Sequence, residues 1–188
     1  MDVYENCPVL ENERYLLRQT VDEDCDDLLK VYSDEKSVPL FNSDNCHGDD
    51  FHYRSSERMA QAIAFWHASY RRRDFVRWSI IDKRKCEAIG TVELFHRKAD
   101  DFFTNTGLLR LDLRSDYERK EIIAELIAML IPYVCEWFSC KSITTKAIPE
   151  AAARREALCA AGFQECINTI KGHNGERYGD YFIRFGNV

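Results

Sequence analysis

The fold of this chain is decided by the stretch Asp116-Tyr117-Glu118-Arg119-Lys120-Glu121-Ile122-Ile123-Ala124-Glu125-Leu126. The residues just before it, 108–113, predict a strand, and apolar residues from Lys120 onward recur at helical spacing. A strand that runs into a helix N-terminus is a common anion site, because free N–H groups and the positive end of the helix dipole face the ligand. Such loops usually carry glycine, which lets the backbone approach the ligand closely. Here the glycines are absent and Glu121 lies among the residues that supply the amides. The stretch therefore predicts an anion site in which some of the usual residues have been replaced.

The bulk composition is that of an ordinary globular protein. The chain has 188 residues, 45% apolar and 31% charged, and its length fits one domain spanning residues 1–188. The net charge of -6 argues against general nucleic-acid binding, which favours a basic surface. It is compatible with a cationic substrate such as an amine, although acidic globular proteins are common.

Targeting and metal signals are absent from the sequence. No run approaches the roughly 18 consecutive apolar residues of a membrane span, and the first five residues lack the basic and apolar regions of a signal peptide. We therefore expect a cytoplasmic protein with no membrane partner. The eight cysteines form no Cys-x-x-Cys pair, and the five histidines show no ligand spacing with them, which predicts reduced thiols and no metal site.

The pattern along the chain predicts one α/β domain with the element order βα, α, βββ, α, β, α, ββ. Strands are expected at 14–19, 76–81, 88–95, 108–113, 142–147, 163–170 and 178–185, and helices after Thr20, from Ser55, from Lys120 to about Phe138, and from Pro149 to Gly162. Pro132 lies inside the third helix and predicts a kink or a break there. Asn174-Gly175 predicts a hairpin between the last two strands. The irregular segment 33–54 either faces a substrate or is a plain flexible connection.

Four short motifs join this element order. They are Ile89-Gly90-Thr91, Tyr117 with Lys120 and Glu125, Ile148-Pro149-Glu150 through Leu158 to Gly162-Phe163, and Asp180 in Tyr178-Gly179-Asp180-Tyr181. Together they resemble the GNAT superfamily of acyl-CoA-dependent N-acetyltransferases, in particular the branch that acetylates the N-terminal amine of ribosomal proteins. The likeness runs from about Arg14 to Phe185. It implies a central mixed, mostly antiparallel sheet of about seven strands with a splayed parallel pair, and about four helices.

The resemblance also implies a co-substrate and an acceptor. Acetyl-CoA would lie in a V-shaped gap between the two splayed strands, and its acetyl group would pass to a primary amine on a protein N-terminus or a small molecule. The pantetheine arm would pair with the backbone around Leu111 and Leu113. The pyrophosphate would sit on amides from the segment Glu118, Arg119, Lys120, Glu121, Ile122, Ile123 and Ala124.

Candidates for the proton-transfer groups are few. Amine attack on a thioester needs a base, and Glu93 and Asp112 lie on predicted central strands where each either faces the cleft or is simply exposed to solvent. An acid cannot be named from the sequence. Trp78, Tyr53 and Trp66 either line an acceptor pocket or belong to the core.

The departures from the family fall on the site itself. Its Gln/Arg-x-x-Gly-x-Gly/Ala motif falls on Glu118 to Ile123, so that Glu121 replaces the central glycine, and Ala151 and Arg154 replace an asparagine and a serine of the second motif. A like-charge contact at about 4 Å costs about 1 kcal/mol in water and about 4 kcal/mol at a protein surface. Two main hypotheses follow: an active N-acetyltransferase, or a catalytically silent GNAT fold that binds a ligand or protein and has weakened or lost CoA binding. A third is a homodimeric structural module.

Overall fold

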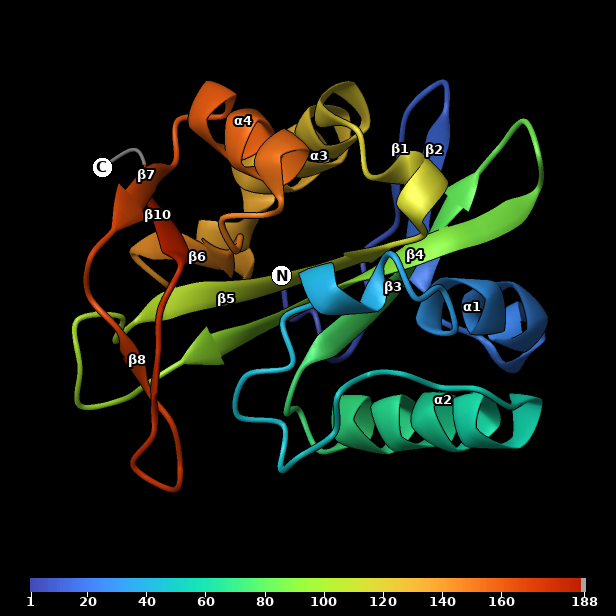
Figure 1. The fold of residues 1–188 in the computed structure, drawn as a ribbon, viewed down its shortest axis with the longest axis horizontal. Coiled ribbons are helices and arrows are strands. Elements are labelled where there is room, and N and C mark those ends of the chain that lie inside the picture. Colours follow the sequence, from blue (N-terminus) through green and yellow to red (C-terminus); the bar gives the residue numbers. More distant parts are fainter. Residues whose placement is uncertain (187–188) are drawn as a thin grey trace.

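An eight-stranded sheet with the order β1-β2-β3-β4-β5-β6-β10-β7 runs through the computed structural model, which describes residues 1–186 (Figure 1). The strands are β1 (Leu10–Glu11), β2 (Tyr15–Gln19), β3 (Val76–Asp82), β4 (Glu87–Arg97), β5 (Thr106–Leu113), β6 (Ser142–Lys146), β7 (Gln164–Cys166), β8 (Ile170–Lys171), β9 (Arg177–Tyr178) and β10 (Tyr181–Phe185). The helices are α1 (Cys25–Tyr32), α2 (Ser56–Arg71), α3 (Lys120–Trp137) and α4 (Ala152–Ala160). The predicted fold class is confirmed.

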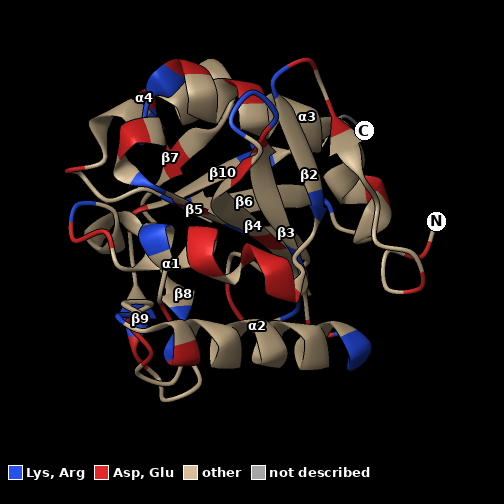
Figure 2. Ribbon diagram, turned by 90° about the vertical axis from the view of Figure 1, so that its right-hand side faces the viewer, with Lys and Arg blue, Asp and Glu red and all other residues tan. Residues whose placement is uncertain are grey.

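The helices cover the two faces of the sheet in pairs. Helices α3 and α4 lie on one face and α1 and α2 on the other, and Figure 2 shows the same separation from a direction turned by 90°. Because side chains alternate between faces along a strand, each strand sends one set of residues toward each helix pair. On β5, Leu109, Leu111 and Leu113 belong to the core cluster that includes the buried face of α3.

The parallel pair β5 and β6 separates part of the way along its length. Their register runs from Thr106 opposite Ser142 to Leu109 opposite Thr145 and stops there. On its other edge, β5 continues to pair with β4 as far as Leu113. Residues 110–113 of β5 therefore border a gap on the β6 side, which we call the β5–β6 gap. This is the predicted splayed pair.

The helix boundaries follow local chemistry. Ser55 caps α2 by accepting a hydrogen bond from the Arg58 N–H at 3.2 Å. A 3-10 turn, Asp22–Asp24, follows Thr20, so that α1 itself begins only at Cys25. Helix α3 continues through Pro132, so no break occurs there.

The C-terminal segment is more divided than the sequence suggests. Strands β8 and β9 form the predicted hairpin, and Gly175 in its turn has φ +87°, which suits glycine. The predicted strands 163–170 and 178–185 are each interrupted, so that β7 and β10 join the main sheet and the hairpin stands apart. Helix α4 begins at Ala152, later than predicted, and Gly162 with φ +82° follows its end.

No helix within residues 1–186 has the length and apolar character needed to cross a bilayer.

Candidate active site

The β5–β6 gap is bordered by backbone groups of β5. The Arg114 N–H donates to the Ile89 carbonyl at 3.0 Å, which fixes the antiparallel pattern between β5 and β4. In such a ladder the backbone groups of successive residues turn to opposite edges. Those of Leu111 and Leu113 therefore turn toward the gap.

The loop between β5 and α3 uses most of its own amides. The N–H groups of Tyr117, Glu118 and Arg119 donate to carbonyls within the turn, at 2.9, 3.2 and 2.7 Å. The Ser115 N–H donates to the Asp34 carboxylate at 2.9 Å. Burial opposes the ionisation of Asp34, but this bond and its neighbours lower its pKa to about 2. The loop thus already binds one carboxylate of the protein.

Three amides of the predicted pyrophosphate segment remain. Among the described residues, the N–H groups of Lys120, Glu121 and Ile122 have no hydrogen-bond partner. They form the first turn of an 18-residue helix, where the dipole is positive. The Ile123 N–H, by contrast, donates to the Arg119 carbonyl at 3.0 Å within the helix.

Of the two glutamates in the predicted pyrophosphate segment 118–124, only one lies at the gap. Glu121, which replaces the family's central glycine, has an exposed side chain. The Glu118 side chain is only 9% exposed and pairs with Arg154. Glu118 is therefore the acidic side chain that takes part in closing the gap.

Arg154 of α4 closes the gap from within. Its guanidinium group donates to both carboxylate oxygens of Glu118, at 2.8 Å each, and to the Leu111 carbonyl, also at 2.8 Å. A further bond of 3.1 Å reaches the Leu40 carbonyl, and Arg154 is only 2% exposed. In this conformation a pantetheine arm that pairs with β5 would compete with Arg154 for the Leu111 carbonyl.

The two candidate bases lie on the opposite face of the sheet, against α1 and α2, and neither is exposed to solvent. Glu93 is 1% exposed and pairs with Arg77 and with Arg110, the latter at 2.6 Å. Burial favours its neutral form, but the two guanidinium groups more than offset this and hold the pKa of Glu93 below its ordinary value. A carboxylate held in this way is a weak proton acceptor.

Asp112 is also fully buried. One of its oxygens accepts hydrogen bonds from the Tyr32 hydroxyl at 2.7 Å and from Arg77 at 3.3 Å. Its other oxygen, Oδ1, has no partner among the described residues. Burial raises the pKa of Asp112, in spite of the nearby Arg77 charge. The two carboxyl groups therefore share one arginine but have pKa values displaced in opposite directions.

Arg77 organises this buried cluster. Besides its acidic partners it donates to the Tyr32 hydroxyl at 2.8 Å and to Thr91 at 3.1 Å, and its guanidinium lies 4.2 Å from the Trp66 ring centroid. Sequence reasoning missed Arg77, because a charged residue in an alternating strand is usually exposed. The available signal was the combination of Arg77 and Glu93 on two strands that form a hairpin.

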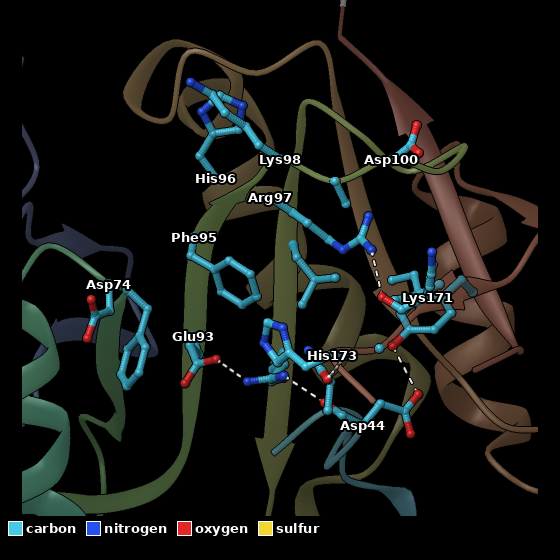
Figure 3. Close-up of a pocket in the computed structure, with 18 residues that line it drawn as sticks. Asp44, Asp74, Glu93, Phe95, His96, Arg97, Lys98, Asp100, Lys171 and His173 are labelled. Atoms are coloured by element: carbon cyan, nitrogen blue, oxygen red, sulfur yellow. Dashed lines mark hydrogen bonds and ion pairs between the residues drawn. The ribbon is translucent and has the colours of Figure 1, made fainter. Parts of the chain in front are cut away.

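Two neighbouring cavities border this cluster and share Glu93, Arg110, Phe75 and Asn45. The first, of about 440 Å³, lies between the end of β4 and the β8–β9 hairpin, with Glu93, Phe95 and His173 around it (Figure 3). The second, of about 470 Å³, is aromatic. Its aromatic ring residues are Phe51, Tyr53, Phe65, Trp66 and Phe75.

The irregular segment 33–54 contributes to both cavities, with Asp44 in the first and Tyr53 in the second. It is thus more than a flexible connection. Trp78, by contrast, is fully buried in the core and donates to the Pro8 carbonyl at 2.7 Å. Of the three aromatic residues considered from the sequence, only Tyr53 and Trp66 line a cavity.

Comparison with known proteins agrees with this architecture. Residues 14–164 match the model of the acetyltransferase (GNAT) domain. The chain is 22% identical over 163 residues to the uncharacterized N-acetyltransferase YoaA of Bacillus subtilis, covering 84% of each chain. This chain belongs to the GNAT acetyltransferase family. The family carries out acyl transfer and generally uses acetyl-CoA.

Two solved structures illustrate the shared fold. The ribosomal-protein-S5-alanine acetyltransferase from Vibrio fischeri superposes with a TM-score of 0.69 at 18% identity, over 96% of this chain and 97% of that one. The acetyl transferase from Salmonella typhimurium that modifies the N-terminal serine of 50S subunit protein L7/L12 gives a TM-score of 0.68 at 12% identity, over 96% and 100%. At these identities the likeness shows the fold alone.

Proposed function

We propose that this protein is an N-acetyltransferase that moves an acetyl group from acetyl-CoA to a primary amine, on a protein N-terminus or on a small molecule. The observation that carries the proposal is the β5–β6 gap, with backbone groups of Leu111 and Leu113 along one side. The free N–H groups of Lys120 to Ile122 lie in the helix that follows the loop after β5. A strand edge suits an amide-bearing arm, and a helix N-terminus suits a pyrophosphate.

The acceptor is assigned to the two cavities around Glu93. Leu108 and Arg110 line the first cavity, and β6 leaves β5 just beyond Leu109, so the cavity adjoins the closed end of the gap. The aromatic walls of the second cavity suit an apolar or aromatic part of the acceptor. An amine held between these cavities would lie beside Leu108 and Arg110, where β5 and β6 separate.

The test is amine-dependent release of the CoA thiol by the wild-type protein. The acceptors are short peptides with N-terminal serine or alanine and a set of arylalkylamines, each at millimolar concentration with acetyl-CoA. We expect release only with free amines, together with a mass-spectrometric signal for the acetylated product. The matched control is the same peptide with a blocked N-terminus. Release no faster than without protein, for every amine, would contradict the proposal.

A second candidate function is supported by a specific observation. Arg154 occupies the Leu111 carbonyl, and Arg77 contacts both carboxylates that could serve as a base. These contacts favour a catalytically silent GNAT fold that binds a ligand in its cavities. Such a protein would bind amines or other ligands without any release of CoA thiol, so the same assay with a parallel binding measurement separates the two functions.

A further inference from the structure

The guanidinium group of Arg154 lies in a site formed by three segments. Glu118 comes from the loop after β5, Leu111 from β5 itself, and Leu40 from the segment between α1 and α2. Four hydrogen bonds of 2.8 to 3.1 Å join the group to these partners. A buried, bidentate arginine–carboxylate pair is among the stronger polar contacts in proteins. The contacts hold Arg154 in one place at the edge of β5.

This placement opposes a second occupant. The Leu111 carbonyl already accepts a hydrogen bond from Arg154 on the side of the β5–β6 gap. An amide N–H of an acyl-CoA arm that pairs with β5 would compete with Arg154 for this oxygen. Glu118, largely buried beside the arginine, would in addition repel an approaching phosphate if its partner moved away.

The pair also links the gap to the segment between α1 and α2. Arg154 donates to the carbonyl of Leu40, at the end of the 3-10 turn Val38–Leu40, and Asp34 accepts a hydrogen bond from the Ser115 N–H in the loop before α3. Both contacts come from the segment between α1 and α2, which also supplies Asp44 and Tyr53 to the cavities. Opening the pair would therefore release the attachment at Leu40, while Arg110 of β5 still donates to the Asp44 carbonyl at 3.0 Å.

We infer that the Arg154–Glu118 pair controls entry to the acyl-CoA site, so that acyl-CoA binds only to molecules in which the pair has opened. The inference rests on the proposed function, since it takes the β5–β6 gap as the acyl-CoA site. The measured affinity is then the intrinsic affinity reduced by the fraction of open molecules. Removing the pair makes that fraction close to one.

The test is calorimetric titration with acetyl-CoA of the wild type and of the double variant E118Q/R154S. The double variant removes both charges, because removing one alone leaves the other buried without a partner. We expect it to bind acetyl-CoA at least tenfold more tightly than the wild type. Arg154→Lys, which keeps the charge but loses the bidentate geometry, is expected to change the affinity in the same direction by a smaller factor.

A matched control separates control of entry from a general effect of breaking an ion pair on α4. Arg155 follows Arg154 in α4, and its ion pair with Glu165 lies away from the gap. Glu165→Gln breaks that pair and is expected to leave the affinity for acetyl-CoA unchanged. Cooperative thermal unfolding of every variant shows that each is folded.

The outcomes distinguish the inference from the proposed function. A folded E118Q/R154S protein that binds no more tightly than the wild type overturns the inference. So does weaker binding by Arg154→Lys, which would make Arg154 a ligand of the cofactor. Tighter binding without acetylation of any amine supports the control of entry but contradicts the proposed N-acetyltransferase activity.

Discussion

Arg154 and Glu118 are 36 residues apart in the chain, and their side chains form a buried pair with two hydrogen bonds of 2.8 Å. The pair connects α4 to the loop that leads into α3. Because Arg154 also donates to the Leu111 carbonyl, the same ion pair stabilises the folded domain and closes the β5–β6 gap.

Removing Arg154 alone is expected to destabilise the protein strongly. Arg154→Ala leaves the Glu118 carboxylate largely buried without its partner, which typically costs about 3–5 kcal/mol. The free energy of unfolding in urea measures the effect. Glu165→Gln is the matched control, because Glu165 is 56% exposed and the loss of such a pair costs less than about 1 kcal/mol. Equal losses in the two variants would contradict the buried character of the Arg154–Glu118 pair.

Glu93 is expected to stabilise the protein in a pH-dependent way. Burial opposes its ionisation, but Arg77 and Arg110 hold its pKa below the ordinary 4.5, so its contribution is complete above about pH 4.5 and is lost as the pH falls through the lowered value. At pH 7, Glu93→Gln is expected to cost about 3 kcal/mol, since it leaves two buried guanidinium groups undercompensated. Urea unfolding from pH 7 to pH 3 should show this difference shrinking. A difference that stays constant would count against the pairing.

Asp112 is expected to show the opposite slope. Burial raises its folded-state pKa above the ordinary 3.8, so its contribution is complete below that pH and is lost as the pH rises through the raised value. Relative to Asp112→Asn, the wild type should therefore be most stable in acid and should lose that advantage toward neutral pH. The same urea series measures it. If the stability lost in Asp112→Asn and in Glu93→Gln changed with pH in the same direction, the two carboxyl groups would not have pKa values displaced in opposite directions.

The aromatic cavity gives a prediction about the acceptor. Phe65 lines that cavity and is 56% exposed, so Phe65→Ala should remove a contact with the amine at little cost in stability. We expect the KM for an aromatic amine to rise several-fold, because a lost apolar contact of this size is worth about 1 kcal/mol or more. The control is Phe185→Ala on β10, a phenylalanine that is 60% exposed and is not among the residues lining either cavity. An equal rise in KM for both variants would place the acceptor elsewhere.

Much of the architecture could be predicted because its signals are local. The alternating leucines of β5 and the helical spacing of α3 are read over a few residues, and both elements lie where the sequence places them. The later start of α4 is also local, but it depends on a turn in which the Ala151 N–H donates to the Ile148 carbonyl. Propensity alone does not reveal that turn.

The site could be predicted less well, because its contacts join distant segments. The departures at Glu118 and Arg154 are visible in the sequence as two separate changes, and only the fold shows that they form one ion pair. The missing glycine at Glu121 predicts that this side chain disturbs the anion site, yet the side chain is exposed. Arg77 gathers Tyr32, Glu93 and Asp112 from three elements, so no local pattern identifies it as the centre of a buried cluster.

Hydrogen–deuterium exchange with and without acetyl-CoA measures whether acyl-CoA binds in the β5–β6 gap. The protein is compared as the wild type and as E118Q/R154S, at ligand concentrations up to several millimolar. We predict slower exchange in residues 108–124, greatest at the free amides of Lys120 to Ile122, and reached at lower ligand concentration in the double variant. Unchanged exchange in this segment, or slowing confined to residues 44–53, would contradict binding of acyl-CoA in the β5–β6 gap.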